Sequence, residues 1–160
     1  MHHVLEREQL LPRSRAEVFA FFSHAENLEA ITPSWLRFRI VTPLPIAMQE
    51  GTVIDYRLRL LGIPMRWRSR IDVWEPGVRF VDRQLVGPYA RWVHFHEFDD
   101  VPGGVRMRDR VEYTLPGAPI SDLVHPILRL QLDAIFAFRR RTIESAFLST
   151  NRRPLRFRET

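Results

Sequence analysis

Between residues 52 and 73 the sequence reads TVIDYRLRLLGIPMRWRSRIDV, a stretch in which apolar and polar side chains largely alternate. A period of two is the pattern of β-strands that bury one face and expose the other. The alternation is interrupted at residues 61–64 (LGIP), where glycine and proline favour a turn. The stretch therefore predicts an antiparallel hairpin of two half-buried strands.

The same period extends on both sides of this hairpin, from residue 37 to residue 113. Residues 76–77 (PG) and 87–88 (GP) are turn dipeptides, and a further loop is expected over residues 99–104. Successive strands joined by short turns form an antiparallel meander. We therefore expect a meander whose arginine-rich face points outward.

One strand and two short helices are expected before the meander. Residues 4–11 read as a strand that ends at Pro12. Residues 14–17 (SRAE) have the Ser-x-x-Glu pattern of a capping box, which predicts the start of a helix. Residues 23–26 (SHAE) repeat this pattern and predict a second short helix, which ends before Pro33.

A single long helix is expected after the sheet. Apolar residues recur at spacings close to three, four and seven between residues 120 and 148, the pattern of an amphipathic helix. Pro126 lies near its start, where proline is tolerated. Residues 151–160 are expected to form a basic, peripheral tail, so that a single domain spans residues 1–150.

This order of elements predicts an α+β fold. A twisted sheet with one apolar face must cover that face, and the last helix is the only expected element long enough to do so. The predicted fold class is therefore α+β of the helix-grip type, a curved antiparallel sheet wrapped around a long C-terminal helix. Because such a sheet grips the helix along only part of its length, a cavity is expected between them.

The composition is that of a globular chain without covalent cross-links. Hydrophobic residues make up 45% of the 160, and the absence of cysteine removes disulfides and thiolate chemistry. No apolar run approaches the ~20 residues of a membrane span, and the start lacks a secretory pattern, so we expect a cytoplasmic protein. All 24 basic residues are arginine and the net charge is +5, which we interpret as a solubilising surface.

The most specific motif is FVDRQLVGPY at residues 80–89, which continues through Trp92, His94, His96 and Phe98. With VFAFF at residues 18–22 and AENLE at residues 25–29, it resembles the START-like, or SRPBCC, helix-grip superfamily, in its polyketide cyclase/dehydrase branch. It is most similar to a bacterial subgroup sometimes joined to a nucleotide-sugar epimerase-like domain. The resemblance implies a pocket for an apolar or aromatic small molecule. It does not imply catalysis, because many members of the superfamily only bind their ligands.

The expected hairpins bring polar side chains together on the inner face of the sheet. A regular hairpin around residues 99–104 sets Phe98 opposite Val105, and stepping back by twos gives the earlier pairs. Those pairs are His96 with Met107, His94 with Asp109, and Trp92 with Val111. The turn at residues 87–88 places Asp82 near His94 and Gln84 near Trp92.

His94, flanked by Asp82 and Asp109, is the candidate catalytic group. A carboxylate in an apolar pocket must be paired or protonated, and a histidine between two of them can move a proton near neutral pH. Buried Asp–His–Asp groups also occur as structural networks, and we favour a structural or ligand-positioning role over catalysis. The three residues lack a recognised metal-ligand spacing, so neither a metal nor a cofactor is expected.

Three functions compete. The leading hypothesis is the binding of a hydrophobic or aromatic, lipid- or polyketide-like molecule in the internal cavity. The second is a cyclase or dehydratase in which His94 is the proton shuttle and Gln84 or Tyr56 holds a carbonyl. The residues expected to contact the ligand are Tyr56, Trp67, Phe80, Gln84, Trp92, His96, Phe98, Met107, Leu128, Leu132 and Ile135.

The third and least favoured hypothesis is contact with nucleic acid or another anionic partner through the outer arginines. Acidic residues share that outer face and can pair with the arginines across strands. No nucleic-acid motif accompanies the arginines. The sequence leaves the oligomeric state open, a homodimer included.

Overall fold

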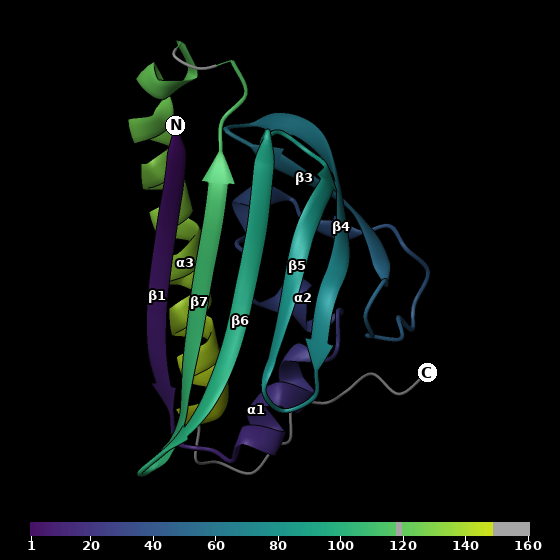
Figure 1. Ribbon diagram of the computed structural model, residues 1–160, viewed down its shortest axis with the longest axis vertical. Helices are drawn as coiled ribbons and strands as arrows, with labels where there is room; N and C mark the ends of the chain where they lie inside the picture. The colour runs from purple at the N-terminus through teal and green to yellow at the C-terminus, as the bar shows by residue number, and fades with distance from the viewer. Residues whose placement is uncertain (118–119, 149–160) are drawn as a thin grey trace.

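A curved antiparallel sheet and one long helix form the framework of the protein (Figure 1). The computed structural model describes residues 1–117 and 120–148. Within these residues the sheet has seven strands in the order β1-β7-β6-β5-β4-β3-β2. The strands are β1 (His2–Leu11), β2 (Arg39–Ile40), β3 (Val53–Leu60), β4 (Ile63–Glu75), β5 (Arg79–Val86), β6 (Arg91–Val101) and β7 (Gly104–Thr114).

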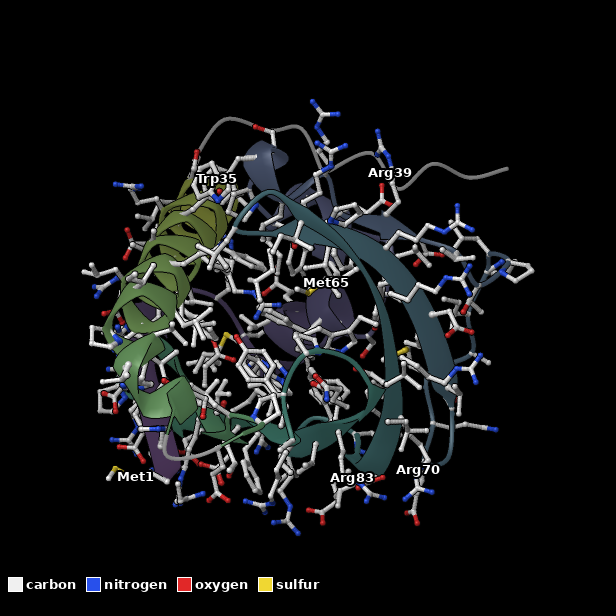
Figure 2. All side chains as sticks on the ribbon, turned by 90° about the horizontal axis from the view of Figure 1, so that it is seen from above. Met1, Trp35, Arg39, Met65, Arg70 and Arg83 are labelled. Atoms are coloured by element: carbon white, nitrogen blue, oxygen red, sulfur yellow. The ribbon has the colours of Figure 1, made fainter. Side chains whose placement is uncertain are left out.

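The helices follow the first strand and the last. They are α1 (Arg15–Phe22), α2 (Asn27–Ala30), the 3-10 turns η1 (Ser34–Leu36) and η2 (Ile120–Leu123), and α3 (His125–Leu148). Seen from above in Figure 2, α3 lies on one side and the sheet curves round the side chains that separate the two. This arrangement confirms the predicted α+β helix-grip fold. The predicted tail, residues 151–160, lies outside the described residues. No helix in the described part of the chain is both long enough and apolar enough to cross a membrane.

The capping pattern before α1 is confirmed, and its apparent repeat is not. The Ser14 hydroxyl accepts a hydrogen bond from the backbone N–H of Glu17, whose carboxylate accepts one from the backbone N–H of Ser14. Ser23 instead ends α1, and its hydroxyl donates to the carbonyl of Phe19 at 2.8 Å. The N-cap of α2 is Glu26, which makes no side-chain capping bond. The prediction of a second capping box at residues 23–26 was wrong, because a Ser-x-x-Glu pattern can also occur where a helix ends.

The hairpin between β6 and β7 is tighter than predicted. Val101 pairs with Gly104, so the turn contains two residues and both strands extend through the expected loop. Each predicted pair is therefore displaced by two positions. The observed pairs are Phe98 with Met107, His96 with Asp109, His94 with Val111, and Trp92 with Tyr113. A shift of two leaves every side chain on its predicted face, so the inward set is unchanged although the predicted pairs were wrong.

A β-bulge in β4 changes which face its end presents. Ile71 pairs with Asp82 and Val73 pairs with Val81, which leaves the residue between them without an opposite neighbour. Trp74 therefore turns inward and packs against Phe80, with ring centroids 5.5 Å apart. Strict alternation along β4 would point Trp74 outward with Arg70 and Asp72, and the bulge reverses its direction.

Two apolar clusters hold α3 against the sheet at different levels. One contains the phenylalanines of α1 with Ile143 and Phe147 of α3. The other packs Leu132 and Phe136 of α3 against residues of β1, β6 and β7. Full burial of each large apolar side chain stabilises the fold by about 1.5–3 kcal/mol. These two clusters anchor the ends of the space in which the candidate site lies.

Candidate functional site

A cavity of about 200 Å³ lies between the sheet, the α1–α2 region and the middle of α3. Aromatic and aliphatic side chains make up most of its wall. Ile54, Trp67 and Phe80 contribute from three strands, and Phe136 contributes from α3. Apart from tyrosine and tryptophan, the polar side chains on the wall are His24, Asn27, Thr32, Ser69, Asp82, His94, His96 and Arg139. The site is thus a mostly apolar hollow with a few polar groups, the usual composition of a small-molecule pocket.

Most of the predicted site residues lie on this wall. They are Tyr56, Trp67, Phe80, Asp82, Trp92, His94, His96, Leu132 and Ile135. The strand residues share the wall because inward positions on neighbouring strands converge inside a curved sheet, and Leu132 and Ile135 face them from α3. Their contact with a ligand stays a prediction.

The other predicted residues do not line the cavity. The side chain of Gln84 folds back and donates to the backbone carbonyl of Tyr89 at 2.7 Å. Phe98 and Met107 are buried in the cluster around α1, and Leu128 packs against the cluster that contains Trp92. Asp109 lies on the inner face, and its contacts are with the histidines.

His94, His96, Asp82 and Asp109 form a closely packed buried group, here called the His–Asp cluster. His94 donates from Nε2 to Asp109 Oδ1 at 3.1 Å, and His96 donates from Nε2 to Asp82 Oδ2 at 3.1 Å. Across the cluster, His96 Nδ1 lies 2.9 Å from Asp109 Oδ1, and His94 Nδ1 lies 3.8 Å from Asp82 Oδ2. The two imidazole centroids are 3.7 Å apart. The predicted Asp–His–Asp juxtaposition is therefore present, with His96 as a further member.

Burial and charge act in opposite directions on the cluster. Burial lowers the pKa of His94 to about 4, and the charge of His96 adds to this effect. Burial would also lower the pKa of His96, but the adjacent carboxylates of Asp109 and Asp82 outweigh burial and raise that pKa. Burial would raise the pKa of both carboxyl groups, but their bonds to the histidines outweigh it and lower the pKa of Asp82 and Asp109. At neutral pH the cluster therefore contains two carboxylates and a neutral His94, and His96 is the imidazole that takes up a proton more readily.

The variant His94→Gln is expected to lose less stability than the wild type as the pH falls from about 7 to about 4. The pKa of His94 is about 4 in the folded protein and 6.5 for an ordinary histidine, so the unfolded wild type binds a proton that the folded protein does not. The stability contributed by neutral His94 is complete above about pH 6.5 and is lost progressively towards about pH 4. Urea unfolding of both proteins in EDTA, at several pH values, measures this. A constant difference in unfolding free energy across the range would contradict it.

Arg139 is the most informative wall residue that the sequence did not reveal. It lies one turn after Phe136 on α3, and its guanidinium carbon is 5.9 Å from the centre of that ring. Its charge helps to lower the pKa of Asp82. Among the described residues, no acidic group lies within ion-pair distance of Arg139. A charged residue on an otherwise apolar helix stripe is the only signal that could have indicated it.

The outer arginines are largely paired with acidic neighbours. Figure 2 shows Arg70 and Arg83 pointing away from the sheet, and both form ion pairs with Asp72 at 2.7 Å. Further cross-strand or neighbouring pairs are Arg68–Asp55, Arg79–Glu75, Arg91–Glu112, Arg106–Asp99, Arg108–Glu97 and Arg110–Glu112. This pairing offsets most of the positive charge on the face and weakens the case for binding a nucleic-acid backbone.

No family model matches the sequence, and no curated protein is significantly similar to it. Solved structures match over nearly the whole chain. A protein from Thermus thermophilus has a TM-score of 0.71 at 16% identity, covering 94% of this chain and 100% of its own. The ZhuI aromatase/cyclase from Streptomyces has a TM-score of 0.71 at 13% identity, covering 89% of this chain and 92% of its own.

A major latex-like protein from Panax ginseng is also similar, with a TM-score of 0.67 at 13% identity over 92% of this chain and 98% of its own. Identities this low establish a shared fold and no finer property. They agree with the element order, the curved sheet and the position of α3 described above. The chain therefore has the helix-grip fold of the START-like, or SRPBCC, proteins.

Proposed function

We propose that residues 1–150 form a single domain that binds a small apolar or aromatic molecule in the internal cavity. The observation that carries this proposal is a mostly apolar hollow of about 200 Å³ inside a folded domain. A concave, mostly apolar pocket with a few polar groups is the usual site of a small-molecule ligand. The ZhuI aromatase/cyclase, whose name denotes the formation of aromatic rings, has the same fold.

The size and wall of the cavity narrow the class of ligand. An apolar cavity of roughly 150 Å³ is large enough to hold benzene. A molecule of one or two rings therefore suits this site. Trp67 and Trp92 meet edge to face at 5.3 Å, and both present aromatic surface to the cavity. Aromatic pairs of this geometry favour a flat, ring-containing ligand.

Arg139 favours a ligand that carries an acidic group. A guanidinium binds a carboxylate through two parallel hydrogen bonds, and such charge-assisted bonds are stronger in surroundings of low polarity. Arg139 lines the cavity without an acidic partner among the described residues. A small aromatic acid would place its rings among the tryptophans and its carboxylate at Arg139.

A pair of matched probes tests this function. We expect 1-naphthoic acid to bind to the metal-free protein at least roughly 10-fold more tightly than 1-naphthamide, because only the acid forms the charged pair with Arg139. Arg139→Met should abolish this preference. Arg140→Met is the control, since Arg140 pairs with Glu144 and does not line the cavity. Isothermal titration calorimetry of the wild type and the two variants measures the affinity of each protein for both probes.

The two parts of the proposal fail in different ways. Equal affinities for the acid and the amide in the wild type would remove the role of Arg139 and leave apolar binding in place. Absence of binding for both probes and for a broad set of small aromatic compounds would contradict the proposed function itself.

Acid–base catalysis of the cyclase or dehydratase type is the second candidate. Its support is that neutral His94 lines the cavity while Asp109 holds its Nε2. A base held in this way by a buried carboxylate is a common catalytic arrangement. Tyr56 also lines the cavity and could hold a carbonyl, whereas the side chain of Gln84 is engaged with Tyr89. Mass spectrometry of a bound ligand before and after incubation separates the candidates, since an unchanged ligand supports binding alone.

A further inference from the structure

The cavity-facing side of the His–Asp cluster brings three potential metal ligands together. One nitrogen or oxygen from each of Asp82, His94 and His96 lies within 4.8 Å of the other two. Asp82 Oδ2 is 3.1 Å from His96 Nε2 and 3.8 Å from His94 Nδ1. Ligand atoms around a tetrahedral metal ion are about 3.4 Å apart when each metal bond is about 2.1 Å long. Small side-chain adjustments would therefore let all three atoms reach a common ion.

Asp109 occupies the position of a supporting carboxylate behind both imidazoles. Its Oδ1 lies 3.1 Å from His94 Nε2 and 2.9 Å from His96 Nδ1, so each ring turns its other nitrogen towards Asp82. Asp109 does not line the cavity, whereas the three potential ligands do. Histidines that bind metals usually donate their second N–H to such a carboxylate, which fixes the ring and its tautomer.

The cluster also places two carboxylates, Asp82 and Asp109, against two buried imidazoles. His96 Nδ1 lies 2.9 Å from Asp109 Oδ1 without the alignment of a good hydrogen bond, so this contact is mainly electrostatic. Buried carboxylates are stabilised by nearby positive charge, and a divalent cation would add such charge beside Asp82.

We propose that Asp82, His94 and His96 bind one divalent transition-metal ion at the wall of the cavity, with Asp109 positioning both histidines. Two imidazoles and one carboxylate suit Zn²⁺ and its neighbours in the first transition series. Three protein ligands would leave at least one coordination position for water or for a molecule bound in the cavity. The site goes beyond the proposed binding of an aromatic molecule, since it can be loaded with metal alone. Sequence spacing did not indicate it because the carboxylate comes from a neighbouring strand, β5.

Titration of the EDTA-treated, dialysed protein with Zn²⁺ tests the site. Isothermal titration calorimetry is expected to give one Zn²⁺ per chain. Asp82→Asn should weaken binding by about 100-fold or more, and Asp109→Asn by about 10- to 100-fold. The control is the double variant His3→Gln/His125→Gln. It removes a separate pair of imidazoles, which stack with their ring centroids 3.7 Å apart, and it should leave the affinity for Zn²⁺ unchanged.

Two kinds of result would overturn the site. The first is the absence of stoichiometric Zn²⁺ binding, or equal affinity in the wild type and Asp82→Asn. The second is loss of binding in the double variant, which would place the metal at His3 and His125 instead. If Asp82→Asn does not fold, imidazole ¹⁵N NMR of the wild type decides. Shifts of His94 and His96 on addition of Zn²⁺ support the site, and shifts confined to other histidines refute it.

Discussion

Replacing Asp109 by alanine is expected to lower the free energy of unfolding by about 3–5 kcal/mol, the usual effect of removing one partner from a buried charged pair. Asp109 is 9% exposed, and its carboxylate is the hydrogen-bond acceptor for His94 and the close neighbour of His96. Without it, His96 keeps one carboxylate partner and His94 loses its hydrogen bond. Urea unfolding followed by circular dichroism, in EDTA, measures the loss.

Asp99→Ala is the matched control for this substitution. Asp99 also accepts from two basic side chains, Arg106 and Arg108, but on the exposed outer face. Surface ion pairs contribute about 1 kcal/mol or less, because water screens them. A loss in the Asp109 variant no larger than in the Asp99 variant would show that the His–Asp cluster does not stabilise the fold.

The second large effect is expected from Gly104→Ala, with a loss of about 3 kcal/mol or more from strain. Gly104 opens β7 with a φ of +152°, and a Cβ at this position would lie 2.0 Å from the carbonyl oxygen of Leu11. Leu11 is the last residue of β1, and it pairs with Val105. A backbone oxygen cannot move aside as a flexible side chain can, so the end of the β1–β7 pairing would have to open.

Gly103→Ala separates this clash from the general difficulty of placing alanine at positive φ. Gly103 has a φ of +89°, and a Cβ there would meet nothing within 4 Å. Its substitution should cost about 1–2 kcal/mol, the ordinary penalty for a left-handed residue with a side chain. Thermal unfolding of both variants gives the comparison. Equal losses would contradict the role assigned to the contact with Leu11.

The period of the sequence was sufficient to predict the inner face of the sheet. Apolar and polar residues alternate clearly in β3 and β7, and the hairpin pairing with β7 extends the inner face to β6. His94, His96 and Asp109 were therefore placed inward correctly. Their cross-strand pairs between β6 and β7 were predicted wrongly, because Asp99 and Asp100 resemble loop residues although they continue β6.

Features that depend on how the strands and helices pack together could not be predicted from the alternation of apolar and polar residues. The bulge at Asp72 turns Trp74 inward, and nothing in the alternation marks it. The cavity wall includes Arg139, whose charge indicates an exposed position when the sequence is read alone. Gln84 had the correct face, but its side chain found a nearer partner in the backbone of Tyr89. The direction of such a side chain depends on which hydrogen-bond partner lies nearest in the folded protein.

The pairing of β1 with β7 has a consequence for the way the chain is made. His2 lies opposite Thr114, so the two strands that close this side of the sheet are separated by roughly 100 positions in the chain. A ribosome releases the first strand long before its partner exists. Hairpins such as β6–β7 can form as soon as they emerge, whereas β1 must wait for the completed meander. Pairing of β1 with β7 is therefore a late step, which can occur only after β7 has left the ribosome and has met a strand far from it in the sequence.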